Sequence, residues 1–212
     1  MTFKEVRDTY WKYYISLEEE FLDTSKYVEF DYINNGRTYS IEYLKLFQTV
    51  CSEIDVVGKA LAKELDSTFS PTKKTGINEW WYSILENDTG IIDKKCALFG
   101  EHSLQPWKGF RVVKNDHEGA KKYILGDNAK TPSWWNDYNS VKHNRTGHFE
   151  RHSLNYSKAN LKNLFFAFAA LYSLEIKLMA SVRMNNETVP TSLESHLFTE
   201  HLTFYTYLLR VN

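Results

Sequence analysis

The chain has few cysteines, few prolines and almost no net charge. It contains two cysteines and four prolines in 212 residues, and its formal net charge is −1. The two cysteines form no spacing motif, so the sequence predicts no disulfide framework, and a reducing compartment suits it best. A net charge near zero excludes a global positive field for nucleic acid, so any polyanion-binding surface must be local.

Long hydrophobic runs are also missing. The longest, residues 164–174, ends at Glu175, well short of the roughly 20 residues that cross a bilayer. Residues 1–14 mix charges with aromatic rings, so we expect no signal peptide and no lipid anchor. The sequence therefore predicts a cytoplasmic protein without a membrane partner. At this length, one domain covering residues 1–212 is expected to bury a single core.

Aromatic residues are unusually frequent, at 16% of the chain. Large rings supply much contact area, and Tyr and Trp also tolerate half-exposed positions at subunit interfaces. Together with the near-zero net charge, this excess predicts a homodimer.

The spacing of apolar residues predicts a mainly α fold. Apolar residues recur at intervals of three and four over residues 3–21 and again over 44–61, where Ser40 serves as the N-cap. A shorter helix is expected from Pro132. Residues 157–184 are apolar on nearly every side, which is typical of a helix packed all round. We therefore predict a helical bundle built around that central helix.

Residues 66–131 differ in character, since six of the nine glycines lie there. We expect an irregular insertion with at most a small β element near residues 97–113, and short helices near 78–86 and 118–125. Beyond Pro190, Thr191 and Glu194 resemble a capping box and predict a last helix, followed by an extended segment over 202–211.

Side chains capable of chemistry are concentrated between Trp134 and His152, where three of the seven histidines lie. One interpretation is a solvated helix end, with cations that complement the helix dipole. The other is an active or anion-binding site, because histidine exchanges protons near neutral pH and arginine binds phosphate bidentately. The candidate catalytic residues are Arg145, His152 and His143. The candidate binding residues are Lys142, Asn144, His148, Tyr138, Asp55 and Glu53.

The acidic candidates belong to the helix over residues 44–61. Asp55 and Lys59 are spaced for an intrahelical ion pair. Alternatively, Asp55 and Glu53 orient a histidine or guanidinium if this helix packs beside the one that carries Lys142. A glycine inside the helix, Gly58, costs about 1 kcal/mol relative to alanine, and a close helix approach would explain it.

A metal site is a further alternative, since His148 and His152 would share a face if this segment were helical. Glu150 is not at the position of a zincin base, and Arg151 places a positive charge against a cation. We predict no metal and no cofactor; a metal-dependent hydrolase that uses His148 and His152 stays as an alternative.

The order of these motifs resembles the HEPN superfamily. It runs from Ser52-Glu53-Ile54-Asp55 through Tyr138-Asn139 and Lys142-His143-Asn144-Arg145 to a polar loop and a long apolar helix. HEPN proteins carry an arginine followed, after four to six residues, by a histidine, and six residues separate Arg145 from His152. The resemblance covers about residues 40–65 and 132–183 and implies a helical bundle.

The resemblance also implies a function, namely metal-independent endoribonuclease activity in a toxin, phage-defence or abortive-infection system. His152 would act as general acid or base while a ribose 2′-OH attacks the adjacent phosphate, and Arg145 would stabilise the charge that develops. The resemblance further implies a homodimer, an RNA substrate and an antitoxin or other protein partner. Exposed aromatic rings such as Trp134 and Trp135 would then serve the dimer interface or stack on bases. The alternative from another class is a non-catalytic helical protein that binds a partner through the same residues.

Overall fold

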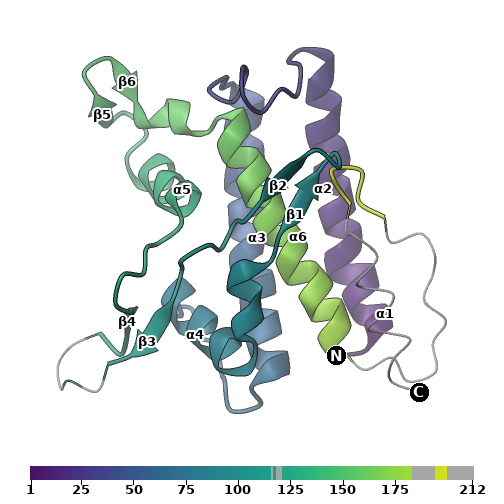
Figure 1. Cartoon of the computed structure of the whole chain (residues 1–212), viewed down its shortest axis with the longest axis vertical. Helices are drawn as coiled ribbons and strands as arrows, with labels where there is room; N and C mark the ends of the chain where they lie inside the picture. Colours follow the sequence, from purple (N-terminus) through teal and green to yellow (C-terminus); the bar gives the residue numbers. More distant parts are fainter. Residues whose placement is uncertain (116, 118–120, 183–193, 200–212) are drawn as a thin grey trace.

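The computed structural model describes residues 1–115, 117, 121–182 and 194–199, and most of them are helical (Figure 1). The amino-terminal helical rod begins at Thr2, whose side chain caps the first turn. The rod continues through a single π-helical turn, and a short 3₁₀ turn closes it. Its segments are α1 (Phe3–Val6), η1 (Arg7–Trp11), α2 (Lys12–Asp23) and η2 (Thr24–Lys26).

Two longer helices complete the bundle. α3 (Ile41–Leu65) begins where expected, because the Ser40 side chain accepts a hydrogen bond from the Tyr43 backbone N–H. α6 (Leu161–Ser181) begins after Asn160, whose side chain accepts from the Asn163 backbone N–H at 3.0 Å. The predicted start at residue 157 was wrong, since residues 155–158 form the 3₁₀ turn η4 (Asn155–Lys158).

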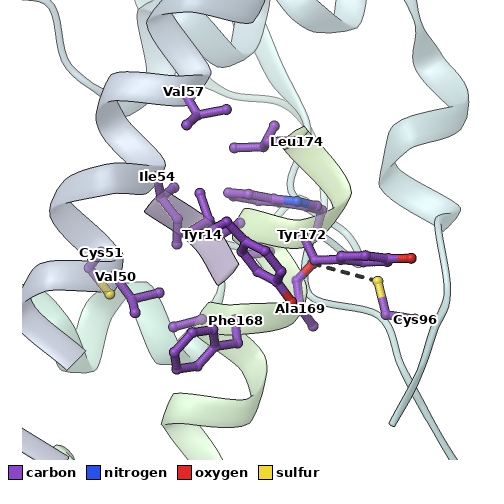
Figure 2. Packing of buried hydrophobic residues seen from close by; sticks show 14 of the residues in the cluster. Tyr14, Val50, Cys51, Ile54, Val57, Cys96, Phe168, Ala169, Tyr172 and Leu174 are labelled. Atoms are coloured by element: carbon purple, nitrogen blue, oxygen red, sulfur yellow. Dashed lines mark hydrogen bonds between the residues drawn. The ribbon is translucent and has the colours of Figure 1, made fainter. Parts of the chain in front are cut away.

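α6 is the central helix of the fold, as its composition predicted. It packs most extensively against α3 and lies between α3 and α2 in Figure 1. Figure 2 shows Val50, Ile54 and Val57 of α3 facing Phe168 and Leu174 of α6. Length and composition alone would let α6 cross a membrane, but 78% of its most apolar window is buried inside the fold.

The region 66–131, expected to be an irregular insertion, contributes side chains to the hydrophobic core. α4 (Ile77–Asn87), predicted from the pattern, packs against α3 and contributes Trp80 and Trp81. The Trp81 and Trp107 rings stack with centroids 4.4 Å apart, and Trp107 meets Trp134 edge-on at 5.3 Å. The aromatic excess is thus used largely within the chain's own core.

Gly58 allows α4 to approach α3. A Cβ at this position would lie 2.8 Å from ring atoms of Trp80, closer than carbon atoms pack. The close approach expected from the sequence is confirmed, with the Trp80 ring filling the space that a side chain would occupy.

Within the described residues, the strands are short and form three small antiparallel sheets, with orders β2-β1-β7, β3-β4 and β5-β6. Their bounds are β1 Cys96–Leu98, β2 His102–Leu104, β3 Val112–Lys114, β4 Tyr123–Leu125, β5 His148–Glu150, β6 Ser153–Leu154 and β7 Phe198–Thr199.

Two predicted helices need correction. Tyr123–Leu125 is strand β4 paired with Val112–Lys114, not the end of a helix, because its aromatic and β-branched residues suit a pleated surface. Residues 194–199 contain no helix and end in β7, which pairs with β1. The proposed cap Thr191 and the segment 202–211 lie outside the described residues.

Candidate functional site

A β-hairpin carries most of the candidate residues. α5 (Ser133–His143) ends at its predicted basic turn, and Asn144 is the C-cap. The chain then forms the β5-β6 hairpin, which projects beyond the bundle in Figure 1. Residues 148–152 are therefore not helical, and the expectation that His148 and His152 share a helical face was wrong. We call residues 142–158 the basic hairpin.

Main-chain contacts fix the base of the basic hairpin. The Tyr156 N–H donates to the Arg145 carbonyl at 3.0 Å, and the Asn155 N–H donates to the Gly147 carbonyl at 2.7 Å. The buried Asn155 side chain donates to the Asn144 carbonyl at 2.8 Å. A Cβ at Gly147 would lie 2.5 Å from the Asn144 amide nitrogen and 2.8 Å from the Asn155 amide nitrogen, so a larger residue here would require these side chains to shift.

Polar side chains that sequence reasoning missed tie the hairpin to α5 and α6. The Lys158 ammonium lies 3.1 Å from an Asp137 carboxylate oxygen, and the Asn163 amide donates to the other oxygen at 2.9 Å. Lys158 also lies 4.8 Å from the centre of the Phe149 ring. Because these partners come from three separate elements, no local spacing signalled the network.

The candidate side chains of the hairpin are mostly exposed to solvent. The Arg145 guanidinium donates to Gln48 of α3 at 3.1 Å, and the Lys142 ammonium lies 5.4 Å from the Tyr138 ring centre. The exposed candidates are Lys142, His143, Asn144, Arg145, His148 and His152. Such exposure suits contact with a large ligand better than chemistry in a dry pocket.

The structure does not bring Arg145 and His152 together within one chain. Arg145 lies at the base of the hairpin, below the Gly147–Asn155 pair, and His152 lies in the turn beyond the Glu150–Ser153 pair. Strand residues advance roughly 3.3 Å each, which separates the two backbones by more than about 10 Å. The Arg145 side chain is directed instead to Gln48.

The remaining candidates do not face the histidines. Asp55 pairs with Lys59 at 2.5 Å and accepts from the Trp80 indole N–H at 2.9 Å, so the intrahelical pair is confirmed. Tyr138 is buried, and burial raises its pKa to about 12. Burial also raises the pKa of Glu53, whose charge acts on Tyr10 and on Glu175 of α6.

Trp134 and Trp135, which were expected to be exposed, are buried in the described structure. Trp134 is 2% exposed and Trp135 is 7% exposed. The indole N–H of Trp134 donates to the Pro106 carbonyl at 2.9 Å, which fixes it as a core residue. The hairpin itself presents Phe149, at 44% exposed, and Leu154, at 39%.

The basic hairpin carries a local excess of positive charge. Residues 142–158 contain four lysines or arginines and three histidines but only one acidic residue, Glu150, in a chain of net charge −1. Among the described residues, no group of three or more His, Cys, Asp or Glu side chains is arranged to hold a metal ion. The local chemistry therefore suits a polyanion.

Two buried glutamates outside the basic hairpin escaped sequence reasoning. Glu18 of α2 accepts hydrogen bonds from the Tyr14 hydroxyl at 2.7 Å and the His196 N–H at 2.8 Å, and also from Ser195. Glu175 is fully buried, and neither carboxyl oxygen has a hydrogen-bond partner within the described residues. A lone acidic residue within the apolar run of α6 was the available signal.

Comparison with known proteins yields no relative. No protein-family model matches the chain, and neither a curated protein nor a solved structure matches it. The HEPN resemblance thus stays a prediction based on its motifs.

Proposed function

We propose that this protein binds RNA through the basic hairpin, with the helical bundle as its scaffold. The observation that carries the proposal is the local excess of positive charge on a projecting hairpin of a chain with net charge −1. Lysine and arginine supply the electrostatic attraction to phosphates. The exposed Phe149 ring offers a face on which an unpaired base can stack.

Charge neutralisation on the hairpin tests the proposal. Substituting Lys142, Arg145 and Arg151 together by glutamine should weaken binding of a labelled single-stranded RNA by about 10- to 100-fold at low salt. The slope of log affinity against log salt should also fall by about two, because each lost phosphate contact contributes roughly 0.7 for single strands. Fluorescence anisotropy measures both quantities.

A matched control removes three equally exposed lysines elsewhere. These are Lys63, at the end of α3, and Lys73 and Lys74, in the loop before α4. Their replacement by glutamine changes the net charge equally and should leave RNA affinity within about twofold, since only charges near the RNA release counterions. Equal losses in the two triple variants would refute a hairpin site.

The HEPN resemblance supports a stronger form of the proposal, in which the protein is a metal-independent endoribonuclease of toxin or phage-defence type. Arg145 and His152 lie at opposite ends of one hairpin. We therefore propose that each cleavage site combines His152 of one copy with Arg145 of a second copy in a homodimer. His152 would move the proton and Arg145 would hold the phosphate.

Mixing two inactive variants tests this composite site. His152→Ala and Arg145→Gln should each lower RNA cleavage in EDTA by about 10²–10⁴-fold. Mixed dimers keep one intact site of two, so an equal mixture should recover about a quarter of wild-type activity. Recovery no greater than the average of the two variants, or a monomer by light scattering at high concentration, would contradict the composite site.

The second candidate is a non-catalytic protein that binds a protein partner, such as an antitoxin, through the same hairpin. The exposed apolar side chains of Phe149 and Leu154 favour this candidate, since protein interfaces are built on apolar and aromatic anchors. Absence of RNA binding at low salt, together with a partner whose affinity falls in Phe149→Ala, would favour it over the RNA proposal.

A further inference from the structure

Positive charge is concentrated in one stretch of the chain that is longer than the basic hairpin. Residues 108–130 contain six lysines or arginines and three acidic residues, and residues 142–158 contain four and one. Each of these two segments therefore carries a net charge of +3. Asp137 is the one charged residue between them, so residues 108–158 carry +5 and the rest of the chain carries −6.

Main-chain hydrogen bonds bring part of the first segment together at the start of α5. Lys108 and Arg111 lie in the turn before β3, and Lys130 lies between β4 and α5. The Lys130 N–H donates to the Gly109 carbonyl at 3.0 Å, and glycine suits this turn because its φ is +73°. The three cationic side chains are exposed, and none has an acidic partner among the described residues. We call Lys108, Arg111 and Lys130 the second basic cluster.

α5 connects the second basic cluster to the basic hairpin through a polar face. Its 11 residues span about 16 Å. Ser133, Asn136 and His143 are exposed and share one face, since they are spaced by three and seven positions. The only acidic residue of the helix, Asp137, is neutralised by the Lys158 ammonium at 3.1 Å. Figure 1 shows β3-β4, α5 and β5-β6 in succession along one side of the bundle.

We propose that a single-stranded RNA runs along α5 and contacts the basic hairpin and the second basic cluster at once. This inference rests on the proposed binding of RNA by the hairpin and specifies its substrate. Successive phosphates of a stacked strand are about 3.4 Å apart, so a helix of about 16 Å requires a strand of about five nucleotides or more. Lysine and arginine at the two ends attract its phosphates, and the exposed amide of Asn136 offers a hydrogen bond between them.

Replacing Lys108, Arg111 and Lys130 together by glutamine tests the second contact. A labelled RNA of about 12 nucleotides should bind about five- to twentyfold more weakly to this cluster variant, and the slope of log affinity against log salt should fall by about two. The variant should fold normally, because all three side chains are exposed. The triple lysine variant that serves as control for the hairpin changes the net charge equally. A loss of affinity no larger than that control shows would overturn the inference.

Comparison with the hairpin variant separates this inference from the RNA proposal itself. If the hairpin variant loses affinity and the cluster variant does not, RNA binds the hairpin without crossing α5. The inference is then wrong and the proposed function stands. If neither variant loses affinity, both are wrong. A loss confined to the cluster variant would overturn both the hairpin site and the path along α5.

RNA length provides a second measurement. An RNA of about four nucleotides, measured by competition against the labelled strand, is too short to reach both ends of α5. Lengthening it to about 12 nucleotides should raise the affinity of the wild type at least about threefold more than that of the cluster variant, because only the wild type gains a second contact on the same strand. Equal gains in the two proteins would overturn the inference.

Asn136 tests the path between the two ends. Asn136→Glu places a negative charge on the exposed face of α5 and should weaken binding of the 12-nucleotide RNA by about three- to tenfold, because the carboxylate repels a strand that crosses the helix. A glutamate this close to the start of a helix does not disturb it. Asn136→Gln, the matched control, keeps the amide and should bind within about twofold of the wild type. Equal affinities of the two variants would overturn the path along α5.

Discussion

Glu175 should make the protein less stable as pH rises through the neutral range. Its carboxyl group is fully buried in α6 and has no hydrogen-bond partner within the described residues. Burial raises its pKa well above the ordinary value of 4.5, and the nearby charge of Glu53 acts in the same direction. The folded chain therefore holds a proton on Glu175 at pH values where the unfolded chain has released it.

The sign of the effect follows from this difference in bound protons. Below about pH 4.5 both states are protonated, and the group has no pH-dependent effect on stability. Above that pH, the free energy of unfolding falls by about 1.4 kcal/mol per pH unit until the folded carboxyl also ionises. The accumulated loss at pH 7 is at most about 3.5 kcal/mol, and the unpaired neutral carboxyl itself costs about 1–3 kcal/mol more.

Urea denaturation of Glu175→Gln at about pH 5 and pH 8 measures this loss. The variant should gain stability relative to wild type at the higher pH and little at the lower one, since glutamine cannot ionise. Glu175→Leu should gain at both, because it also removes the unpaired polar atoms. Glu19→Gln, on an exposed position of α2, is the control. If wild type and Glu175→Gln show parallel pH dependence, Glu175 is not the buried acid responsible.

Two further substitutions test the packing. Gly58→Ala should lower stability by about 1–2 kcal/mol despite its better helix propensity, because its Cβ would meet Trp80; thermal denaturation measures the loss. Gly76→Ala, with no atom within 4 Å of its Cβ, should change stability by less than about 1 kcal/mol. Glu18→Ala should cost about 2–4 kcal/mol and expose the backbone amides of segment 194–199 to hydrogen exchange, since Glu18 accepts several of that segment's hydrogen bonds.

The main helices were predictable because their signals are local. Ser40 lies next to the helix that it caps, and the buried apolar residues of α3 repeat from Tyr43 to Ala62. The start of α6 was missed by four residues, because residues 155–158 form the separate turn η4 and the side chain that caps α6 is Asn160. The mainly α fold around α6 is confirmed.

Strands of two or three residues were harder to predict than helices. Tyr123–Leu125 is too short to show alternation, and its partner Val112–Lys114 defines it. The strands of the basic hairpin were missed for a similar reason. Their register changes between His148 and Glu150, which interrupts the period of two that marks a strand.

The sequence shows where the candidate residues lie along the chain, but it does not show which side chains they contact. Arg145 bonds to Gln48, 97 positions away, and Glu18 bonds to residues 177 to 179 positions away. No spacing rule links residues at such separations. The charge of the basic hairpin could be read from the chain, whereas the direction of each side chain depended on packing between elements.

This division between core and hairpin determines how variants of the hairpin should be interpreted. The side chains of Lys142, Arg151 and His152 are exposed, so their replacement removes charge or the proposed proton carrier with little loss of packing. Gly147 and Asn155 lie at the base of the hairpin, where a Cβ at Gly147 would meet the Asn155 amide that bonds to the Asn144 carbonyl. Changes at these two positions alter the shape of the hairpin itself. A functional defect therefore reports on ligand contact only when it arises from the first group.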